Sequence, residues 1–339
     1  MKTGPAPDLL RRHLMLGLGS LPLLAVLPAS AAALTKPQVD LTALAGQLAA
    51  QTGLKAAAIE AILAQAEFKP DVIDRILTPY ESKPYAVYRP LFVTEQMRVM
   101  GEEYLRDNRA TLDAAADKYG IEPEIVAAIL GMETRFGRYK GKDRVLDSLF
   151  TLATGYPKRA DFFRRELGEF LLMCQEERLN PTDVMGSYAG AFGATQFIPS
   201  SYRGYAVDAD KDGRRDVWNS PADIIGSVAN YFSRHGWQRG RPVAHWLPTR
   251  KSIFEERARE NFSHWTPLAD LRRYIHTVPP MWQDDDKVAV IEMQTSTGMQ
   301  YALVQNNFYV ITRWNRSYNY AMATTEIAAM LGCKTCAVS

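Results

Sequence analysis

The segment that most constrains the fold is the stretch 121–136, in which one carboxylate stands among apolar residues at helical spacing. Pro123 suits the first turn of a helix, where its missing N–H forfeits no hydrogen bond. Advancing about 100° per residue from Ile125 puts Glu133 at about 80°, only about 40° from Ile129. The sequence therefore predicts a helix whose apolar side contains Glu133.

A carboxylate in that position has two interpretations. Burial costs free energy unless the group is paired or neutralised, and desolvation raises the pKa of a carboxylic acid. Glu133 could then hold a proton at neutral pH and donate it, as the general acid in glycosidic cleavage must. The alternative is a structural ion pair with Arg135 or Arg138. The helix alone leaves both interpretations open.

The N-terminal half of the chain is predicted to be helical. Ala and Leu at helical spacing indicate two or three short helices over 41–77, and a further helix is expected over 94–119, closed by Gly120. Prolines between these helices indicate an extended segment that is a linker or a domain boundary: Pro79, Pro84 and Pro90.

The C-terminal half changes character twice. Gly, Ser, Asp and Pro predict long loops over 180–220, followed by a helix over 222–234. Apolar and β-branched runs separated by Gly or Asn turns predict strands at 288–291, 301–304 and 308–312. The fold class expected is mainly α (α+β), with a small β element.

Residues 1–31 have the organisation of a signal peptide. Basic residues precede an apolar run over 14–27, and Ala29-Ser30-Ala31 offers the small-x-small pattern of a cleavage site. A membrane anchor is the alternative, but a spanning helix needs about 20 apolar residues. Arg11-Arg12 resembles a twin-arginine export signal, so either export route stays open. We expect a soluble mature chain in the periplasm, with no transmembrane anchor.

The charge balance argues against nucleic acid as a partner. The whole chain carries +2, and residues 1–31 hold three basic residues and one acidic residue, so the remainder is close to neutral (+2 minus +2). Binding to phosphates needs a surplus of Lys and Arg.

The chain has three cysteines, and two of them are close together. In an oxidising compartment Cys333 and Cys336 could form a short-range disulfide, although two free thiols remain possible. Cys174 is interpreted as a small buried apolar residue.

The stretch 208–219 has the ligand spacing of an EF-hand loop. Asp208, Asp210 and Asp212 occupy loop positions one, three and five, and the backbone carbonyl of Arg214 occupies position seven. Position twelve is Asn219, which cannot supply the two carboxylate oxygens of the usual Glu. A structural Ca²⁺ is expected nonetheless, with a solvated acidic turn as the alternative.

Several segments together resemble a known family. The run 131–137, Gly-Met-Glu-Thr-Arg-Phe-Gly, is similar to the E-[ST]-x-[FY]-G signature around the catalytic Glu of soluble lytic transglycosylases. Further segments resemble the membrane-bound lytic murein transglycosylase B family more narrowly: 156–160, 186–191, 196–202, 226–232 and 307–315. The resemblance covers about residues 40 to 325. The lipid-anchored members of that family have a processing-site Cys, which this chain lacks.

The resemblance implies a lysozyme-like catalytic core with a flanking helical domain and a small β domain. The corresponding segments are an N-terminal helical region over 35–105, a core containing the EF-hand-like loop over 106–240, a β-containing region over 241–325 and a tail over 326–339.

The implied activity is non-hydrolytic cleavage of the MurNAc–GlcNAc β-1,4 bond of peptidoglycan, leaving 1,6-anhydro-MurNAc ends. Glu133 would act first as acid and then as base, so no second carboxylate and no cofactor would be needed for the chemistry. The expected partner is the glycan strand, and the protein is expected to be a monomer.

Carried over residue by residue, the resemblance assigns substrate contacts to Arg159, Ser187, Gln196, Tyr231 and Asn315. Four of these residues also have a structural interpretation. It is a surface charge for Arg159, a helix cap for Ser187, a loop-closing hydrogen bond for Gln196 and core packing for Tyr231. The resemblance further suggests that Asp223 completes the shell of the metal.

Other functions remain possible at this point. A muramidase would use water in place of the C6 hydroxyl, and a glycan-binding protein of the same fold would lack catalysis. A calcium sensor is disfavoured, because one imperfect loop does not make an EF-hand pair.

Overall fold

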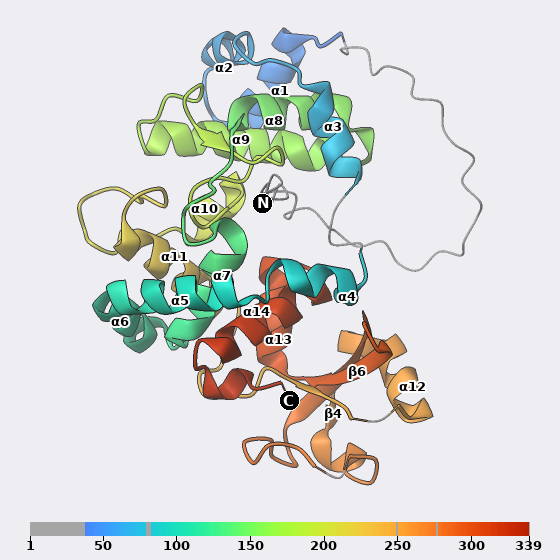
Figure 1. The fold of residues 1–339 in the computed structure, drawn as a ribbon. Coiled ribbons are helices and arrows are strands. Elements are labelled where there is room, and N and C mark those ends of the chain that lie inside the picture. Colours follow the sequence, from blue (N-terminus) through green and yellow to red (C-terminus); the bar gives the residue numbers. More distant parts are fainter. Residues whose placement is uncertain (1–37, 79–82, 249, 276, 339) are drawn as a thin grey trace, which may run out of the picture. The chain divides into compact units, whose positions relative to one another are not determined.

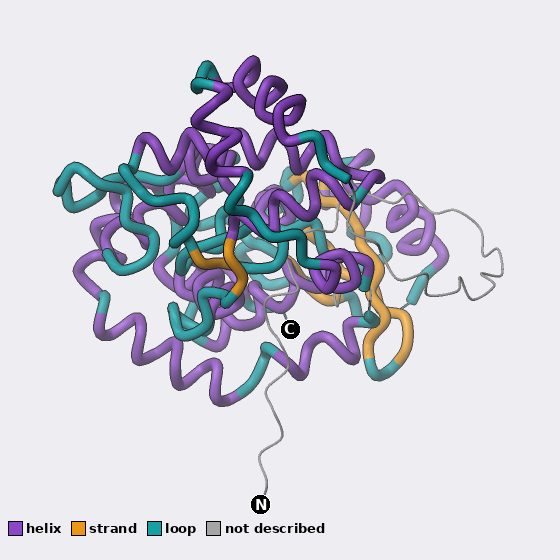
Figure 2. Tube along the Cα trace, turned by 90° about the horizontal axis from the view of Figure 1, so that it is seen from above, coloured by secondary structure: helices purple, strands orange, loops and turns teal. Residues whose placement is uncertain are grey.

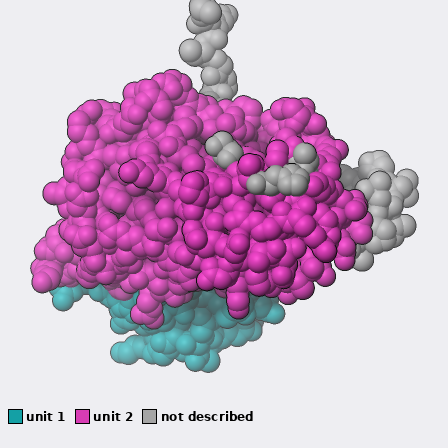
Figure 3. All heavy atoms as spheres, turned by 90° about the horizontal axis from the view of Figure 1, so that it is seen from below, with its two compact units in different colours: residues 1–79, 139–204 teal, residues 80–138, 205–339 magenta. Residues whose placement is uncertain are grey.

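The computed structural model describes residues 38–78, 83–248, 250–275 and 277–338. The predicted signal peptide, residues 1–31, lies outside this range. The chain forms two compact units, coloured separately in Figure 3: residues 1–79 with 139–204, and residues 80–138 with 205–339. Each unit gathers two separate stretches, whereas the segments expected from the sequence are consecutive; those segments stay a prediction.

The first unit is built on helices. Its elements are α1 (Leu41–Thr52), α2 (Ala56–Leu63), α3 (Pro70–Leu77), α8 (Val145–Gly155), η3 (Pro157–Arg159), α9 (Ala160–Glu176), α10 (Pro199–Tyr205) and a short antiparallel ribbon of β1 (Asp143–Arg144) and β2 (Met185–Gly186) (Figure 1). Helix α8 packs on α9, while α1 packs on α9 and α3 on α8. The predicted short helices over 41–77 are confirmed, and Asp40 caps the first of them by accepting from the Ala43 N–H at 2.9 Å.

The second unit surrounds one central helix, α7 (Pro123–Thr134). Helices α5 (Glu95–Asp107), α6 (Arg109–Tyr119), α11 (Pro221–Arg234) and α14 (Tyr318–Met330) all contact α7. Every residue of α7 from Ile125 to Thr134 is buried. Further helical elements of this unit are α4 (Tyr85–Tyr88), η2 (Arg89–Leu91), α13 (Asn306–Trp314) and η6 (Lys334–Cys336).

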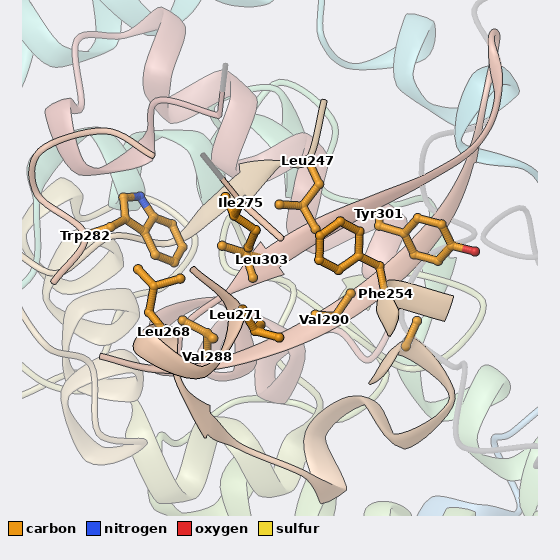
Figure 4. Packing of buried hydrophobic residues seen from close by; sticks show 11 residues of the cluster. Leu247, Phe254, Leu268, Leu271, Ile275, Trp282, Val288, Val290, Tyr301 and Leu303 are labelled. Carbon is orange, nitrogen blue, oxygen red and sulfur yellow. The ribbon is translucent and has the colours of Figure 1, made fainter. Parts of the chain in front are cut away.

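A small sheet belongs to the same unit. Its strands follow the order β3 (Ala244–Trp246), β6 (Gly298–Val304), β5 (Lys287–Thr295) and β4 (Thr266–Pro267), each antiparallel to its neighbours. Helix α12 (Ser252–Glu260) packs on β5 and β6, with η4 (Asn261–Ser263) and η5 (Leu268–Leu271) beside them. Figure 4 shows the buried cluster that joins these elements, in which Phe254 of α12 lies beside Tyr301 of β6, with ring centroids 6.4 Å apart.

The predicted fold class, mainly α with a small β element, is confirmed; Figure 2 shows helices in purple over most of the chain and strands in orange. None of the helices in the described residues has both the length and the hydrophobicity to cross a bilayer.

Three local predictions need correction. The stretch 308–312 is not a strand but lies within α13, where Phe308 and Ile311 are buried three residues apart, so tertiary packing overrides the β-branched composition. The helix expected over 94–119 is two helices that meet at Asn108, although Gly120 does close the second. The linker predicted to be extended contains two short helical turns, α4 and η2, with Pro84 as the N-cap of α4.

Two of the three cysteines are bonded to each other, and the third is a buried free thiol. Cys333 and Cys336 form a disulfide directly after α14, so the free-thiol alternative is excluded. The segment that follows α14 is attached to β3, because Val243 N–H donates to Thr335 O and Trp246 N–H to Val338 O. Cys174 is buried in α9, as predicted, and burial raises the pKa of its thiol to about 12.

Candidate active site

The helix that carries Glu133 ends in an unusual turn. Thr134 is the last residue of α7, and the next three residues, Arg135, Phe136 and Gly137, all have positive φ, at 48°, 59° and 82°. Non-glycine residues rarely adopt this left-handed conformation, and two in succession indicate that the surroundings enforce it. The chain therefore reverses direction immediately after the carboxylate.

Hydrogen bonds close this turn. Phe136 N–H donates to Leu130 O at 3.1 Å, and Gly137 N–H donates to Thr134 Oγ1 at 2.8 Å. The Thr hydroxyl thus acts as an N-cap oxygen does at the start of a helix, by accepting the backbone N–H of Gly137, which lies beyond the last residue of α7. A Ser or Thr directly after the Glu, and a Gly three residues later, are what this geometry requires.

The reversal folds Phe136 back onto α7. A Cβ added at Gly131 would lie 2.8 Å from Phe136 Cζ and 3.0 Å from Met97 Sδ, so only glycine fits beneath the ring. On its other side the ring of Phe136 packs against Tyr104, with centroids 5.2 Å apart. The run 131–137 is therefore a packed unit that presents Glu133 from a rigid element.

Glu133 is buried, with 2% of its surface exposed, as its place in the helical pattern predicted. Its Oε1 accepts hydrogen bonds from Trp314 Nε1 at 2.8 Å and from the Tyr320 hydroxyl at 2.5 Å. Both donors are uncharged. Of the two cations considered for a structural ion pair, Arg138 lies 3.9 Å from Glu103, and Arg135 donates to Leu91 O at 3.5 Å.

Trp314 and Tyr320 are the residues that the sequence interpretation missed. Trp314 is the last residue of α13 and Tyr320 lies in the first turn of α14, so both come from a segment far from α7 in sequence. A usable signal was present, because Trp314 stands inside the motif 307–315 and a buried acid needs N–H or O–H donors.

Tyr231 contacts Trp314, one of the two donors to Glu133. Its hydroxyl donates to Arg313 O at 2.6 Å, and its ring meets that of Trp314 edge-on at 4.8 Å while stacking on His235 at 4.0 Å. Burial raises the pKa of Tyr231 above its usual range, so its hydroxyl stays protonated. The same desolvation lowers the pKa of His235, which favours the neutral ring.

Asn315 follows Trp314 and is also buried. Its Oδ1 accepts from the Ser317 N–H at 3.0 Å, which shapes the short connection between α13 and α14. Glu133, Tyr231 and Asn315 therefore belong to one structural unit. Asn315 lies on the connection between α13 and α14, the two helices that carry the donors to Glu133, and Tyr231 contacts the end of α13.

Ser187 and Gln196 lie in the other unit and form part of one loop. Ser187 Oγ accepts from Ala191 N–H at 3.0 Å, while Gln196 Nε2 donates to Gly193 O at 2.9 Å and to Lys140 O at 3.1 Å. Gln196 also has a positive φ of 50°. Gln196 thus has the loop-closing role considered as its structural alternative. Ser187, for which the structural alternative was a helix cap, instead accepts a hydrogen bond within the same loop.

The same loop explains two glycines. A Cβ at Gly186 would lie 2.1 Å from Ala191 O, and one at Gly141 would lie 2.0 Å from Gly186 O. Two backbone segments therefore approach too closely for any side chain. Arg159, also in this unit, places its guanidinium over the ring of Phe162 at 4.1 Å.

The EF-hand-like loop brings three carboxylates together. Oxygens of Asp208, Asp210 and Asp212 lie within 4.8 Å of one another. Asp208 accepts from Asp212 N–H at 3.1 Å and from Gly213 N–H at 2.9 Å, so the loop is already curled around these groups. Such oxygen donors suit a hard cation such as Ca²⁺.

Asp223 and Arg214 differ in how they relate to this group. Asp223 is buried at the start of α11 and accepts from Ala209 N–H at 2.6 Å and Asp216 N–H at 2.8 Å, so it holds both ends of the loop. Burial raises the pKa of Asp223. Its carboxylate is not among the three that cluster. Arg214 N–H donates to Asp212 Oδ1 at 2.9 Å, which orders the backbone at loop position seven.

Comparison with known proteins identifies a family whose members resemble this chain. The family model described as Transglycosylase SLT domain matches residues 38–329. The membrane-bound lytic murein transglycosylase B of Escherichia coli (strain K12) is 39% identical over 240 residues, which are 71% of this chain and 65% of that protein, so the chain spans somewhat less than two thirds of this relative's length.

Solved structures agree. The soluble lytic transglycosylase SltB1 from Pseudomonas aeruginosa matches with a TM-score of 0.77 and 36% identity, covering 86% of this chain and 98% of that one. The Escherichia coli lytic transglycosylase Slt35 in complex with calcium matches with a TM-score of 0.75 and 34% identity, covering 86% and 92%. The lysozyme-like transglycosylase fold expected from the sequence is therefore confirmed.

Proposed function

This chain belongs to the transglycosylase SLT domain family, and on that premise we propose that it is a peptidoglycan lytic transglycosylase. It cleaves the MurNAc–GlcNAc β-1,4 bond without water and leaves a 1,6-anhydro-MurNAc end. The observation that carries this proposal is Glu133, a buried carboxylate at the end of the central helix, held by two uncharged donors.

The first step is protonation of the leaving group. Glu133 donates its proton to the glycosidic oxygen, and the bond from that oxygen to the anomeric carbon breaks. Because Oε1 already accepts from Trp314 and Tyr320, the proton to be transferred resides on Oε2. Burial supports the protonated state, since desolvation disfavours a charged carboxylate.

The second step uses the same residue as a base. The ionised Glu133 removes the proton of the C6 hydroxyl, whose oxygen attacks the anomeric carbon and closes the anhydro ring. The proton lost in the first step is thereby regained, and no water is consumed. Trp314 and Tyr320 stabilise the ionised carboxylate between the steps, because both hydrogen bonds are strongest to a negative oxygen.

The other proposed substrate contacts rest on fewer observations. Tyr231 and Asn315 adjoin the donors of Glu133, which supports a place beside the reacting sugars. Arg159, Ser187 and Gln196 are assigned to the substrate by family resemblance. Their structural hydrogen bonds do not exclude this role, because a polar group that closes a loop can present the loop's backbone to a sugar.

The product decides between this reaction and its alternatives. Digestion of purified sacculi followed by mass analysis should release anhydro-muropeptides with the wild type and none with Glu133→Gln. Muropeptides with reducing ends would instead establish a muramidase. Absence of soluble products from the wild type would favour a glycan-binding protein.

We further propose that the loop over 208–219 binds a structural Ca²⁺ through Asp208, Asp210, Asp212 and the carbonyl of Arg214. Asp223 holds the loop to α11, and its predicted role as a ligand remains a proposal. The cluster of three carboxylates supports a cation here, because like charges at this spacing repel one another without one. The reaction itself needs no cofactor in this proposal.

Thermal melting tests the calcium site. A chelator should lower the melting temperature, and added Ca²⁺ should restore it. An ion at a hundredfold its Kd stabilises the folded state by about 2.7 kcal/mol. The variant Asp210→Ala should melt lower and ignore the chelator, whereas Asp161→Ala, an exposed acid on α9, should respond like the wild type. Identical melting of the wild type with and without chelator would contradict the site.

We also propose that this chain is exported. Residues 1–31 direct the chain to the periplasm, where peptidoglycan lies, and are removed. N-terminal sequencing of the mature protein should begin shortly after Ala31. Recovery of the full-length chain from the cytoplasmic fraction would contradict this assignment.

A further inference from the structure

A cavity in the unit that contains Glu133 is lined by none of the candidate site residues. It has a volume of about 430 Å³ and is formed by the loop 238–241, the residues before and at the start of β5, Trp265, and the N-terminus of α13. Below it is called the Lys287 pocket. Its size falls in the range of small-molecule sites in proteins.

The base of the Lys287 pocket is a buried carboxylate. The side chain of Asp286 is fully buried and forms an ion pair with Arg241, whose own side chain is 44% exposed. The other oxygen of Asp286 accepts from Gln305 Nε2 at 2.7 Å and from Gln283 N–H at 2.9 Å. These bonds hold the guanidinium of Arg241 in place at the pocket wall.

Asn307 braces the loop that carries Arg241. Its Oδ1 accepts from the Gln238 N–H at 2.8 Å, and its Nδ2 donates to Gln238 O at 2.8 Å and to Arg241 O at 3.3 Å. This buried side chain attaches the loop 238–241 to the first turn of α13. Two buried polar side chains, Asp286 and Asn307, thus fix the loop 238–241 that lines the pocket.

Two opposite charges remain available in the Lys287 pocket. Within the part of the chain that the structure describes, neither Lys287 nor Asp285 takes part in an ion pair, although both line the cavity. Trp265 adds an aromatic wall and is itself backed by Phe262, with the rings stacked at 5.8 Å. A ligand that matches these groups carries a carboxylate, an ammonium and an apolar stem.

The Lys287 pocket is also connected to the catalytic carboxylate by one rigid element. Asn306 of the pocket and Trp314, which donates to Glu133, are the two ends of α13. Eight residue steps at 1.5 Å each separate them by about 12 Å. An extended peptide covers about 3.3 to 3.6 Å per residue, so four residues span this distance.

We propose that the Lys287 pocket binds the peptide branch of peptidoglycan while Glu133 cleaves the glycan strand. This inference rests on the proposed function. In intact peptidoglycan each lactyl carboxyl of the glycan backbone is amide-linked to a peptide, so the backbone itself is uncharged and matches neither Lys287 nor Asp285, whereas the peptide branches carry free carboxylates and the ammonium group of a diamino acid. Amidase leaves the lactyl carboxyl free, but that group is attached directly to the sugar and does not extend along α13 to the pocket. Arg241 and Lys287 receive the carboxylates, and Asp285 receives the ammonium.

Paired substrates test this assignment. Glycan strands bearing tetrapeptides (Ala–γ-Glu–diaminopimelate–Ala) are compared with the same strands after amidase has removed the peptides. The variant Lys287→Glu should raise KM for the peptide-bearing strands about tenfold, equivalent to the loss of one charged contact, with kcat unchanged. Its KM for the peptide-free strands should equal that of the wild type.

The control is Lys334→Glu, the same charge reversal on an exposed lysine of the same unit that does not line the cavity. It should leave both KM values unchanged. Equal kinetics of Lys287→Glu and the wild type on peptide-bearing strands would overturn the inference, as would an equal loss on both substrates. Failure of the wild type to cleave either substrate would instead refute the proposed function.

Discussion

Two helices, one in each unit, carry a glutamate inside their apolar face. Glu133 lies on α7 and Glu166 on α9, and they are 2% and 4% exposed. Each carboxylate accepts hydrogen bonds from two donors. By burial alone the two residues are equivalent, yet only Glu133 stands in a transglycosylase signature.

The difference lies in the donors. Both bonds to Glu166 come from Ser200, through its N–H at 3.0 Å and its hydroxyl at 2.7 Å, one to each carboxylate oxygen. They tie α9 to the start of α10, so the whole carboxylate is engaged in structure. Both bonds to Glu133 reach a single oxygen and come from aromatic side chains. The identity and the placement of the donors, and not burial by itself, therefore distinguish the two carboxylates.

The strongest test of this contrast substitutes each glutamate by its amide. Glu133→Gln should lower the rate of sacculus digestion by about 10³-fold, because general acid–base catalysis contributes on that order. Glu166→Gln should retain most of the activity. Rates of muropeptide release with matched protein concentrations provide the measurement.

Melting temperatures complete that comparison. Glu133→Gln should melt at or above the wild type, because the amide oxygen can still accept from Trp314 and Tyr320 and the cost of a buried charge is gone. A Glu133→Gln protein that is inactive because it has unfolded would show an early transition. In that case the loss of activity would say nothing about catalysis.

A smaller effect is expected for the donors of Glu133. Tyr320→Phe should lower the rate by about 10- to 100-fold, since hydrogen bonds to charged groups contribute about 1.5 to 3 kcal/mol. The lost donor stabilises the ionised carboxylate, so Glu133 keeps the proton that it must donate up to a higher pH, and the descending limb of the rate–pH profile should shift to higher pH.

The chain offers a matched control for this substitution. Tyr85 donates to Glu326 Oε1 at 2.8 Å, another tyrosine–glutamate bond that involves a residue of α14. Tyr85→Phe should cost stability and leave the rate–pH profile in place. Equal profiles for Tyr320→Phe and the wild type would show that the hydroxyl only packs against Glu133.

These two glutamates also show how far sequence reasoning extends. The helical pattern correctly predicted the burial of Glu133, but α7 is buried on all sides, so its apolar arc did not select that position. The same pattern applied to α9 would have selected Glu166, which lies three residues after Phe163 and four before Phe170. The signature 131–137, and not periodicity, separated the two.

What the sequence could not supply was the partner of each buried group. Trp314 and Tyr320 reach Glu133 from more than 180 residues away, a pairing that depends on how α13 and α14 pack on α7. The same limit explains the false strand at 308–312, because β-branched residues favour a strand locally while contacts with α14 and β6 hold this stretch as a helix. Local features such as Thr94, Gly120 and Pro123 at helix ends were predictable from propensity.

The rigidity of the turn after Glu133 is open to a stability test. Gly131→Ala should lower the free energy of unfolding by about 1 to 3 kcal/mol, because the new methyl group meets the Phe136 ring and Met97. Gly46→Ala is the control: it lies within α1 with no atom near the added Cβ, so a stabilisation of about 0.5 to 1 kcal/mol is expected there. Urea unfolding of both variants measures the difference. A neutral Gly131→Ala would mean that the ring moves aside and that the glycine is not required by packing.

The smallest effect expected concerns the pH dependence of Glu166. Burial raises the pKa of Glu166 above that of the unfolded chain, in spite of the two bonds from Ser200. Protonated Glu166 therefore contributes stability that is fully present below the unfolded pKa and is lost as pH rises through the folded pKa. The melting temperature of the wild type, taken relative to Glu166→Gln, should fall between pH 4 and neutral pH. Glu95 gives the opposite sign, because Arg98 lowers the pKa of that exposed carboxylate and its contribution is lost as pH falls. A difference curve for Glu166→Gln that is flat or rises with pH would show that Ser200 stabilises the charged form, and the contrast with Glu133 would then rest on geometry alone.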